Sequence, residues 1–242
     1  MKNIALVSIL ATLLITGCSY GPKVVENRHN FSVTEKSIIE SETELKKYDI
    51  NVLYPTLQNR GYDVEEINKL IEDQILVFVD GFRNNLLDWD DSFVSEGVFN
   101  SLDMSYEIKL LDEKYLSIEY VVSEYFAGAA HPMNFIFSIN FDLISNKIVE
   151  LSDLFAGTEE EYLPTVAELV TAELRKEFTN REMPIEMMYT EGIEPTLDNF
   201  GNFNLVEQGF QFNFSPYHVA PYAAGEFRIL IPYENLNNLI IK

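Results

Sequence analysis

The sequence predicts an α+β protein with antiparallel sheets and two main helices. Three observations lead to this fold class. Short segments of alternating or clustered apolar residues recur along the 242-residue chain, two longer segments repeat apolar residues at helical spacing, and turn residues alone separate most successive strand-like segments. Strands joined by short turns pair antiparallel, whereas parallel neighbours need a long crossover. We therefore expect two related α+β subdomains that pack together.

The first half predicts strands, a helix and a hairpin. Strand-like patterns begin with FSVTEKSIIESE and KYDINVLYPTL, and Tyr54-Pro55 is expected at a strand end or edge because proline has no N–H to donate. A capping box of Asp63 and Glu66 then starts a helix that runs to about Leu87. Its predicted packing face comprises Val64, Ile67, Ile71, Gln74, Phe78 and Phe82. SYEIKLLD and KYLSIEYVVSEYF follow as a hairpin.

The second half predicts a similar succession of elements. NFIFSINFDL is read as a strand and Leu151–Phe155 as the end of another. Thr158 and Glu161 form a capping box for the second helix, whose apolar positions continue to Phe178. NFNLVEQGFQFNF predicts a hairpin, and EFRILIPYENL predicts a last strand followed by a short helix.

The first residues are typical of a bacterial lipoprotein. Lys2 precedes an apolar run that ends at Ile15-Thr16-Gly17-Cys18, the form of a lipoprotein cleavage box. Cys18, the single cysteine of the chain, would then carry diacylglycerol and palmitate. The alternative is an ordinary secretory signal with an unrelated cysteine. These patterns divide the chain into a signal peptide at 1–17, a tether at 18–30, and α+β domains at 31–127 and 128–242.

Export and lipidation set the expected location. With one cysteine the exported chain holds no internal disulfide. We expect a cell-envelope protein anchored through Cys18. In a cell with two membranes it would lie in the outer membrane facing the periplasm, and otherwise on the outer face of the cell membrane.

The charge limits the partners. Seventeen basic and 39 acidic residues give a formal charge of −22. Nucleic-acid binding needs a basic surface, so this class is excluded, as is docking on anionic lipid through protein charge. An acidic surface favours a basic partner and speeds its encounter. It also serves solubility alone, and that alternative stays open.

Two motifs in the second half resemble a known family. FAGAAHPMNFIFSINFD places a Gly-x-Ala-His run at residues 128–131 before Asn140-Phe141-Asp142, and FSPYHVAPYAAG spans residues 214–225. Both motifs resemble the RsiV-like domain, with Ala129 standing where that family usually has glycine. The first half is similar, more loosely, to a PdaC-type domain.

The resemblance implies binding or sensing rather than catalysis. The RsiV-like domain is the extracellular part of an anti-sigma factor that binds lysozyme, and the PdaC-type module precedes a separate deacetylase domain whose HxxxH motif is missing here. We therefore expect no enzyme activity and no cofactor. Lysozyme and peptidoglycan are the expected ligands.

Candidate site residues are few. His131 and His218 are candidates for ligand contacts; a metal site or a general base beside a carboxylate such as Glu226 is the weaker interpretation, because no ligand spacing supports it. Tyr217 and Tyr222, held by neighbouring prolines, offer flat faces for a sugar or a protein. The alternative is a loop that packs its own aromatic rings.

The acidic run DWDD contains Trp89, the single tryptophan, and we count Trp89 as a further candidate contact. A calcium loop there lacks part of the required oxygen-ligand spacing. The sequence leaves two other functions open: an envelope glycan hydrolase with a carboxylate pair, and a structural envelope lipoprotein.

Overall fold

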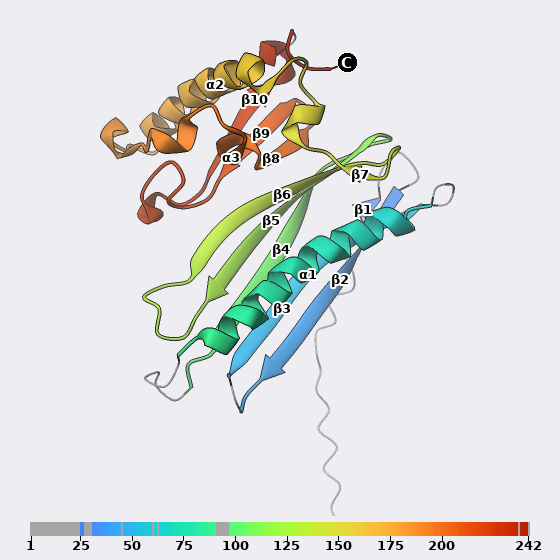
Figure 1. Cartoon of the computed structure of the whole chain (residues 1–242), viewed down its shortest axis with the longest axis vertical. Helices are drawn as coiled ribbons and strands as arrows, with labels where there is room; N and C mark the ends of the chain where they lie inside the picture. The colour runs from blue at the N-terminus through green and yellow to red at the C-terminus, as the bar shows by residue number, and fades with distance from the viewer. Residues whose placement is uncertain are drawn as a thin grey trace, which may run out of the picture.

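The computed structural model describes residues 25–26, 31–44, 46–59, 61, 63–90, 97–236 and 238–241 (Figure 1). The predicted signal peptide and Cys18 lie outside the described residues. Among the helices of the described part, none has the length and apolar character needed to cross a membrane.

The first sheet has seven strands in sequential order, from β1 to β7. Neighbouring strands pair antiparallel except β3 and β4, which run parallel and are connected by a long helix, α1. The strands are β1 Val25–Glu26, β2 Phe31–Glu42, β3 Tyr48–Asn59, β4 Asn100–Leu111, β5 Tyr115–Tyr125, β6 Met133–Asp142 and β7 Lys147–Ile148.

Helix α1 (Glu65–Asp88) crosses one face of this sheet (Figure 1). Its buried side chains recur every three or four residues, as an amphipathic helix requires: Ile67, Ile71, Ile75, Val79, Phe82 and Leu86. The predicted capping box is wrong. Val64 is the N-cap and has no polar side chain to make a cap bond, and the Asp63 carboxylate accepts from the Glu65 amide at 3.0 Å.

Pro55 lies within β3 rather than at its end. The strand continues to Asn59 and pairs with β2 throughout, but its pairing with β4 stops at Val52. Proline is therefore tolerated where β3 no longer has β4 as a neighbour, since no partner there needs its missing N–H.

The second sheet has three antiparallel strands in the order β10-β9-β8: β8 Phe203–Val206, β9 Gly209–Phe214 and β10 Phe227–Pro232. Helix α2 (Glu159–Asn180) packs on this sheet, and its predicted capping box of Thr158 and Glu161 is confirmed. The predicted strand end at Leu151 is wrong, since residues Leu151–Asp153 form a 3₁₀ turn (η1). The remaining helical segments are η2 Ile185–Met187, η3 Glu191–Ile193, α3 Leu197–Phe200, η4 Tyr222–Ala224 and η5 Tyr233–Leu236.

The buried apolar side chains form two clusters. One lies between α1 and the seven-stranded sheet, and the other surrounds α2 and the three-stranded sheet. The predicted fold class, α+β with antiparallel sheets and two main helices, is confirmed. The predicted domain division at 127/128 falls in the β5–β6 turn, within the seven-stranded sheet, whereas the second cluster begins at Val149. The relation between the two halves stays a prediction.

Candidate functional site

The two sheets meet through polar side chains. In β9 the apolar residues Phe210, Phe212 and Phe214 belong to the cluster around α2, and the alternating Gln211 and Asn213 turn to the opposite face. We call this layer the polar seam. It consists of Ser117, Glu119, Ser138 and Asn140 from the large sheet, and Asn204, Gln211, Asn213 and Arg228 from the small one.

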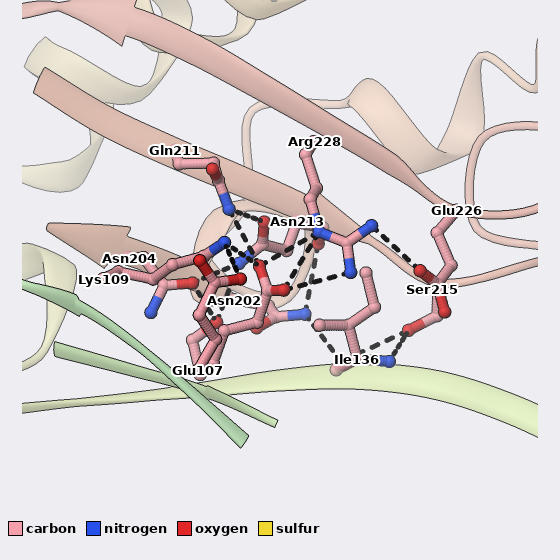
Figure 2. Close-up of polar contacts among 12 residues, drawn as sticks. Glu107, Lys109, Ile136, Asn202, Asn204, Gln211, Asn213, Ser215, Glu226 and Arg228 are labelled. Carbon is pink, nitrogen blue, oxygen red and sulfur yellow. Dashed lines mark hydrogen bonds and ion pairs between the residues drawn. The ribbon is translucent and has the colours of Figure 1, made fainter. Parts of the chain in front are cut away.

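Glu119 is the charged centre of the polar seam. Its side chain is 3% exposed and accepts from the Arg228 Nε at 3.0 and 3.1 Å and from the Gln211 amide at 2.8 Å. Figure 2 labels the two donors, Arg228 and Gln211. Lys109 lies 3.5 Å from the same carboxylate. A buried charge is tolerated when cations and hydrogen-bond donors surround it in this way.

Amides and hydroxyls complete the seam. Ser138 donates to the Asn204 side-chain oxygen at 2.9 Å and accepts from Asn213 at 2.8 Å. Asn140 donates to the Phe203 carbonyl and accepts from the Leu205 amide. Because these bonds are directional, they fix how the small sheet sits on the large one.

At one end, the seam fixes the start of the β9–β10 loop. The Ser215 hydroxyl accepts from the Ile136 amide at 3.0 Å and donates to the Ile136 carbonyl at 3.3 Å, so the first loop residue is bound to β6 (Figure 2). Asn202 also donates to the Ile136 carbonyl. The loop from Ser215 to Gly225 is therefore held against the large sheet.

Three of the candidate residues come together at this loop. The His131 ring stacks on the Tyr222 ring with centroids 4.1 Å apart, and the Tyr217 ring lies 5.3 Å from Tyr222. His131 is exposed, and half of Tyr217 is accessible to solvent. We call these three rings the aromatic surface. The rings pack on one another, as the predicted structural interpretation of the loop has it, and they are partly open to solvent. Ligand binding by these rings stays a prediction.

The Tyr222 ring has a fixed position. Its hydroxyl donates to the Pro132 carbonyl at 2.7 Å and accepts from the Asn134 amide group at 3.0 Å. Tyr217 adopts φ 71°, a left-handed backbone conformation that is costly for a bulky residue. The fold thus holds Tyr217 in a strained, exposed conformation beside an anchored ring.

Arg181, just beyond α2, supports the far side of the loop. Its guanidinium donates to the Ala224 carbonyl at 3.0 Å and to Glu177 at 2.7 Å, and it lies 4.0 Å from the Phe227 ring centroid. The Arg181 contacts fix the turn that follows Tyr222, and Gly225, with φ 72°, completes that turn.

His218 lies in different surroundings from His131. Its Nε2 donates to the Asn199 side-chain oxygen at 3.1 Å, and its ring meets Phe214 edge-on. Gly192 packs so closely that a Cβ there would lie 2.1 Å from the His218 carbonyl oxygen. These neighbours give His218 a role in holding the loop; its part in ligand binding stays a prediction.

Burial lowers the pKa of His218, against an opposing hydrogen bond to the Gly192 backbone. The unfolded chain therefore takes up a proton at this position before the folded chain does, and stability falls as pH drops below about 6.5. We expect wild type to lose more unfolding free energy than His218→Gln between neutral pH and pH of about 5. Denaturant unfolding at both pH values measures this. Equal losses would contradict it.

Trp89 lies at the end of α1, not in the aromatic surface. Its indole N–H donates to the Ala127 carbonyl at 3.0 Å, and its ring packs 5.1 Å from Phe126. Lys46 donates to the Trp89 carbonyl. Trp89 thus connects the helix end to the end of β5, and its role in ligand binding stays a prediction.

Candidate groups for catalysis can also be placed. Within the described ranges, no cluster of three or more His, Cys, Asp or Glu side chains is arranged to hold a metal ion. Glu107 and Glu119 face each other across β4 and β5, but Lys109 lies 2.9 and 3.5 Å from them. Together with Arg228, Lys109 gives this carboxylate pair a structural role. Glu226, the proposed partner of a histidine base, is paired with Arg228 at 2.9 Å.

Sequence reasoning missed Asn134 and Arg181, which position the aromatic surface, and Glu119 and Arg228, which join the sheets. The alternation in FQFNF and FRILIP signalled one polar face on the small sheet. The alternation did not indicate that a second sheet covers this face, because a polar face shows the same alternating sequence whether it is buried or exposed to solvent.

One family model matches the C-terminal part of the chain. The family described as "Protein of unknown function (DUF3298)" matches residues 152–234. Two crystal structures of DUF3298 family proteins resemble the fold. The one from Bacteroides fragilis has a TM-score of 0.62 at 20% identity and covers 89% of this chain and 96% of its own. The one from Pseudomonas aeruginosa has a TM-score of 0.60 at 17% identity and covers 86% of this chain and 94% of its own.

The curated relatives are distant, and the matches cover only part of them. The peptidoglycan-N-acetylmuramic acid deacetylase PdaC of Bacillus subtilis is 24% identical over 81% of this chain and 39% of its own length. The immunogenic protein MPT64 of Mycobacterium tuberculosis is 27% identical over 47% of each chain. The matches therefore span less than half of the curated relatives' length. Neither of these two relatives is named RsiV.

Proposed function

We propose that this chain is a lipid-anchored, non-catalytic cell-envelope protein that binds a cell-wall-related ligand, lysozyme or peptidoglycan. The observation that carries the proposal is the aromatic surface, in which His131 and Tyr217 are exposed and the half-buried Tyr222 is anchored by Pro132 and Asn134. Rigid aromatic side chains are typical of recognition sites, because little side-chain entropy remains to be lost on binding.

Two further observations support the envelope assignment. The distant relative PdaC is named for a peptidoglycan sugar, and the sequence that ends at Cys18 has the form expected of a lipoprotein cleavage box. Incorporation of labelled palmitate into wild type, and its loss in Cys18→Ala, tests the anchor. Labelling that persists in Cys18→Ala would contradict it.

Calorimetric titration of the full chain in detergent tests the binding function. Lysozyme of the c type and peptidoglycan fragments are each added at low and high salt. We expect saturable heat with one of them, and about a tenfold loss of affinity in Tyr217→Ala. Tyr217→Phe, which keeps the ring, is the matched control and should bind as wild type does.

Salt separates the two ligands. Capture of a basic protein by a chain of charge −22 weakens as salt rises, whereas stacking on a sugar barely changes. The proposed function is contradicted if neither ligand gives saturable heat, or if Tyr217→Ala binds as tightly as wild type.

A further inference from the structure

A row of polar side chains crosses the large sheet and ends at the aromatic surface. The strand register places Asn51 beside Asp103, Asp103 beside Ser123, and Ser123 beside Asn134. The Asn134 side chain then donates to the Tyr222 hydroxyl at 3.0 Å. We call Asn51, Asp103, Ser123 and Asn134 the polar row.

The polar row faces away from α1. Its members alternate along their strands with Val52, Leu102, Met104 and Val122, which are buried in the cluster beneath α1. Successive strand residues point to opposite faces, so the row lies on the face that carries the polar seam further along β5 and β6. Asn51 and Asp103 are exposed, and Ser123 and Asn134 are partly exposed. The small sheet therefore covers only part of this face.

A second row runs beside the first. Asp49, Ser101 and Tyr125 are cross-strand neighbours one register step away, and Asp49 is exposed. The two rows present carboxylate, carboxamide, hydroxyl and phenol groups and contain neither lysine nor arginine. They therefore offer hydrogen bonds to an uncharged polyol and no positive charge to a phosphate or another polyanion.

We propose that this face binds an uncharged glycan strand of N-acetylhexosamine type. The glycan lies along the polar row and stacks a sugar ring on Tyr217 or Tyr222. The inference rests on the proposed function and specifies its ligand. Four neighbouring strands span about 14 Å from Asn51 to Asn134, and the aromatic surface continues beyond, so the site suits several consecutive sugars.

The chemistry favours a glycan over a basic protein. Two of the seven side chains in the rows are acidic, Asp49 and Asp103, and the others are neutral hydrogen-bonding groups. Binding sites for small polar ligands combine a few placed polar groups with aromatic faces, and that combination occurs here. A basic protein would instead require clustered carboxylates.

Titration of the full chain in detergent with N-acetylglucosamine oligomers of increasing length tests the site. The extent of the polar row predicts that affinity rises with the length of the oligomer. We expect Tyr217→Ala to weaken short and long oligomers by about tenfold. Asn51→Ala, at the far end, should weaken only the longer oligomers, by about fivefold. Asn84→Ala, on the exposed side of α1, is the matched control and should bind all oligomers as wild type does.

Asp103→Asn separates glycan from protein binding. The carboxamide keeps an acceptor oxygen, so oligomer affinity should change less than in Asp103→Ala, whereas affinity for lysozyme would fall equally in both. The inference is overturned if no oligomer binds, or if Asn51→Ala and Asp103→Ala bind long oligomers as wild type does. Lysozyme binding without oligomer binding would overturn it and leave the proposed function intact. Failure of lysozyme, oligomers and peptidoglycan alike would overturn both.

Discussion

Replacing Glu119 by alanine is expected to lower the free energy of unfolding by about 3–5 kcal/mol, the cost of breaking a buried ion pair from one side. The variant removes the Glu119 acceptor from the Arg228 guanidinium, which keeps Glu226, and from the Gln211 amide, which keeps Asn213. It also leaves Lys109, 12% exposed, without one of its two carboxylates. Chemical denaturation followed by circular dichroism measures the loss.

Glu173→Ala is the control for this prediction. Glu173 pairs with Lys176 on the exposed side of α2, and such a pair contributes about 0.2–1 kcal/mol. Similar losses in the two variants would show that the polar seam does not hold the sheets together. Because Ser215 and Asn202 connect the same region to β6, Glu119→Ala should also weaken binding at the aromatic surface.

Replacing Phe212 by alanine is expected to cost about 3–5 kcal/mol of unfolding free energy. The side chain is fully buried among Phe200, Phe203 and Phe210, and truncation leaves a cavity under α2. The loss should appear as a lower denaturant midpoint with an unchanged slope.

Leu230→Ala provides the comparison within the same sheet. Leu230 alternates with Ile229 and Ile231 on β10 and is 42% exposed, so its truncation should cost about 0.5 kcal/mol or less. Equal costs for Phe212→Ala and Leu230→Ala would contradict the assignment of faces from which the polar seam was derived.

Much of the fold could be predicted from local patterns. The Thr158 capping box, the hairpin of β4 and β5 and the alternation in β9 are properties of short segments, and all three appear as expected. The start of α1 could not be predicted, because an aspartate can accept from the amide two or three residues later. Asp63 accepts from Glu65, two residues later, and not from Glu66 as a capping box requires. The continuation of β3 beyond Pro55 depends on where its pairing with β4 ends, and that is a property of the tertiary structure.

The candidate site was only partly predictable, for a related reason. The aromatic residues of the Ser215–Phe227 segment are conspicuous in sequence, but His131 joins them from a turn more than 80 residues earlier. Asn134 and Arg181 come from β6 and the end of α2, and no local pattern distinguishes them from solvated residues. The polar row exists only through the register of four strands.

The proposed surface spans both parts of the chain. The loop that bears Tyr217 lies in the segment that matches the DUF3298 model, whereas the polar row lies on the seven-stranded sheet and His131 in its β5–β6 turn, both outside that segment. Residues 152–234 alone would therefore contain only part of the proposed surface. The polar seam gives the two parts a fixed relative position.

Nuclear magnetic resonance of the isotope-labelled full chain during titration with peptidoglycan fragments tests the central claim most directly. The account predicts chemical-shift changes at residues 131–134 and 215–225 and along the strands that carry Asp103 and Ser123, with α1 unaffected. Changes centred on α1 or on the start of α2, or saturable binding that leaves Tyr217 and Tyr222 unperturbed, would contradict it.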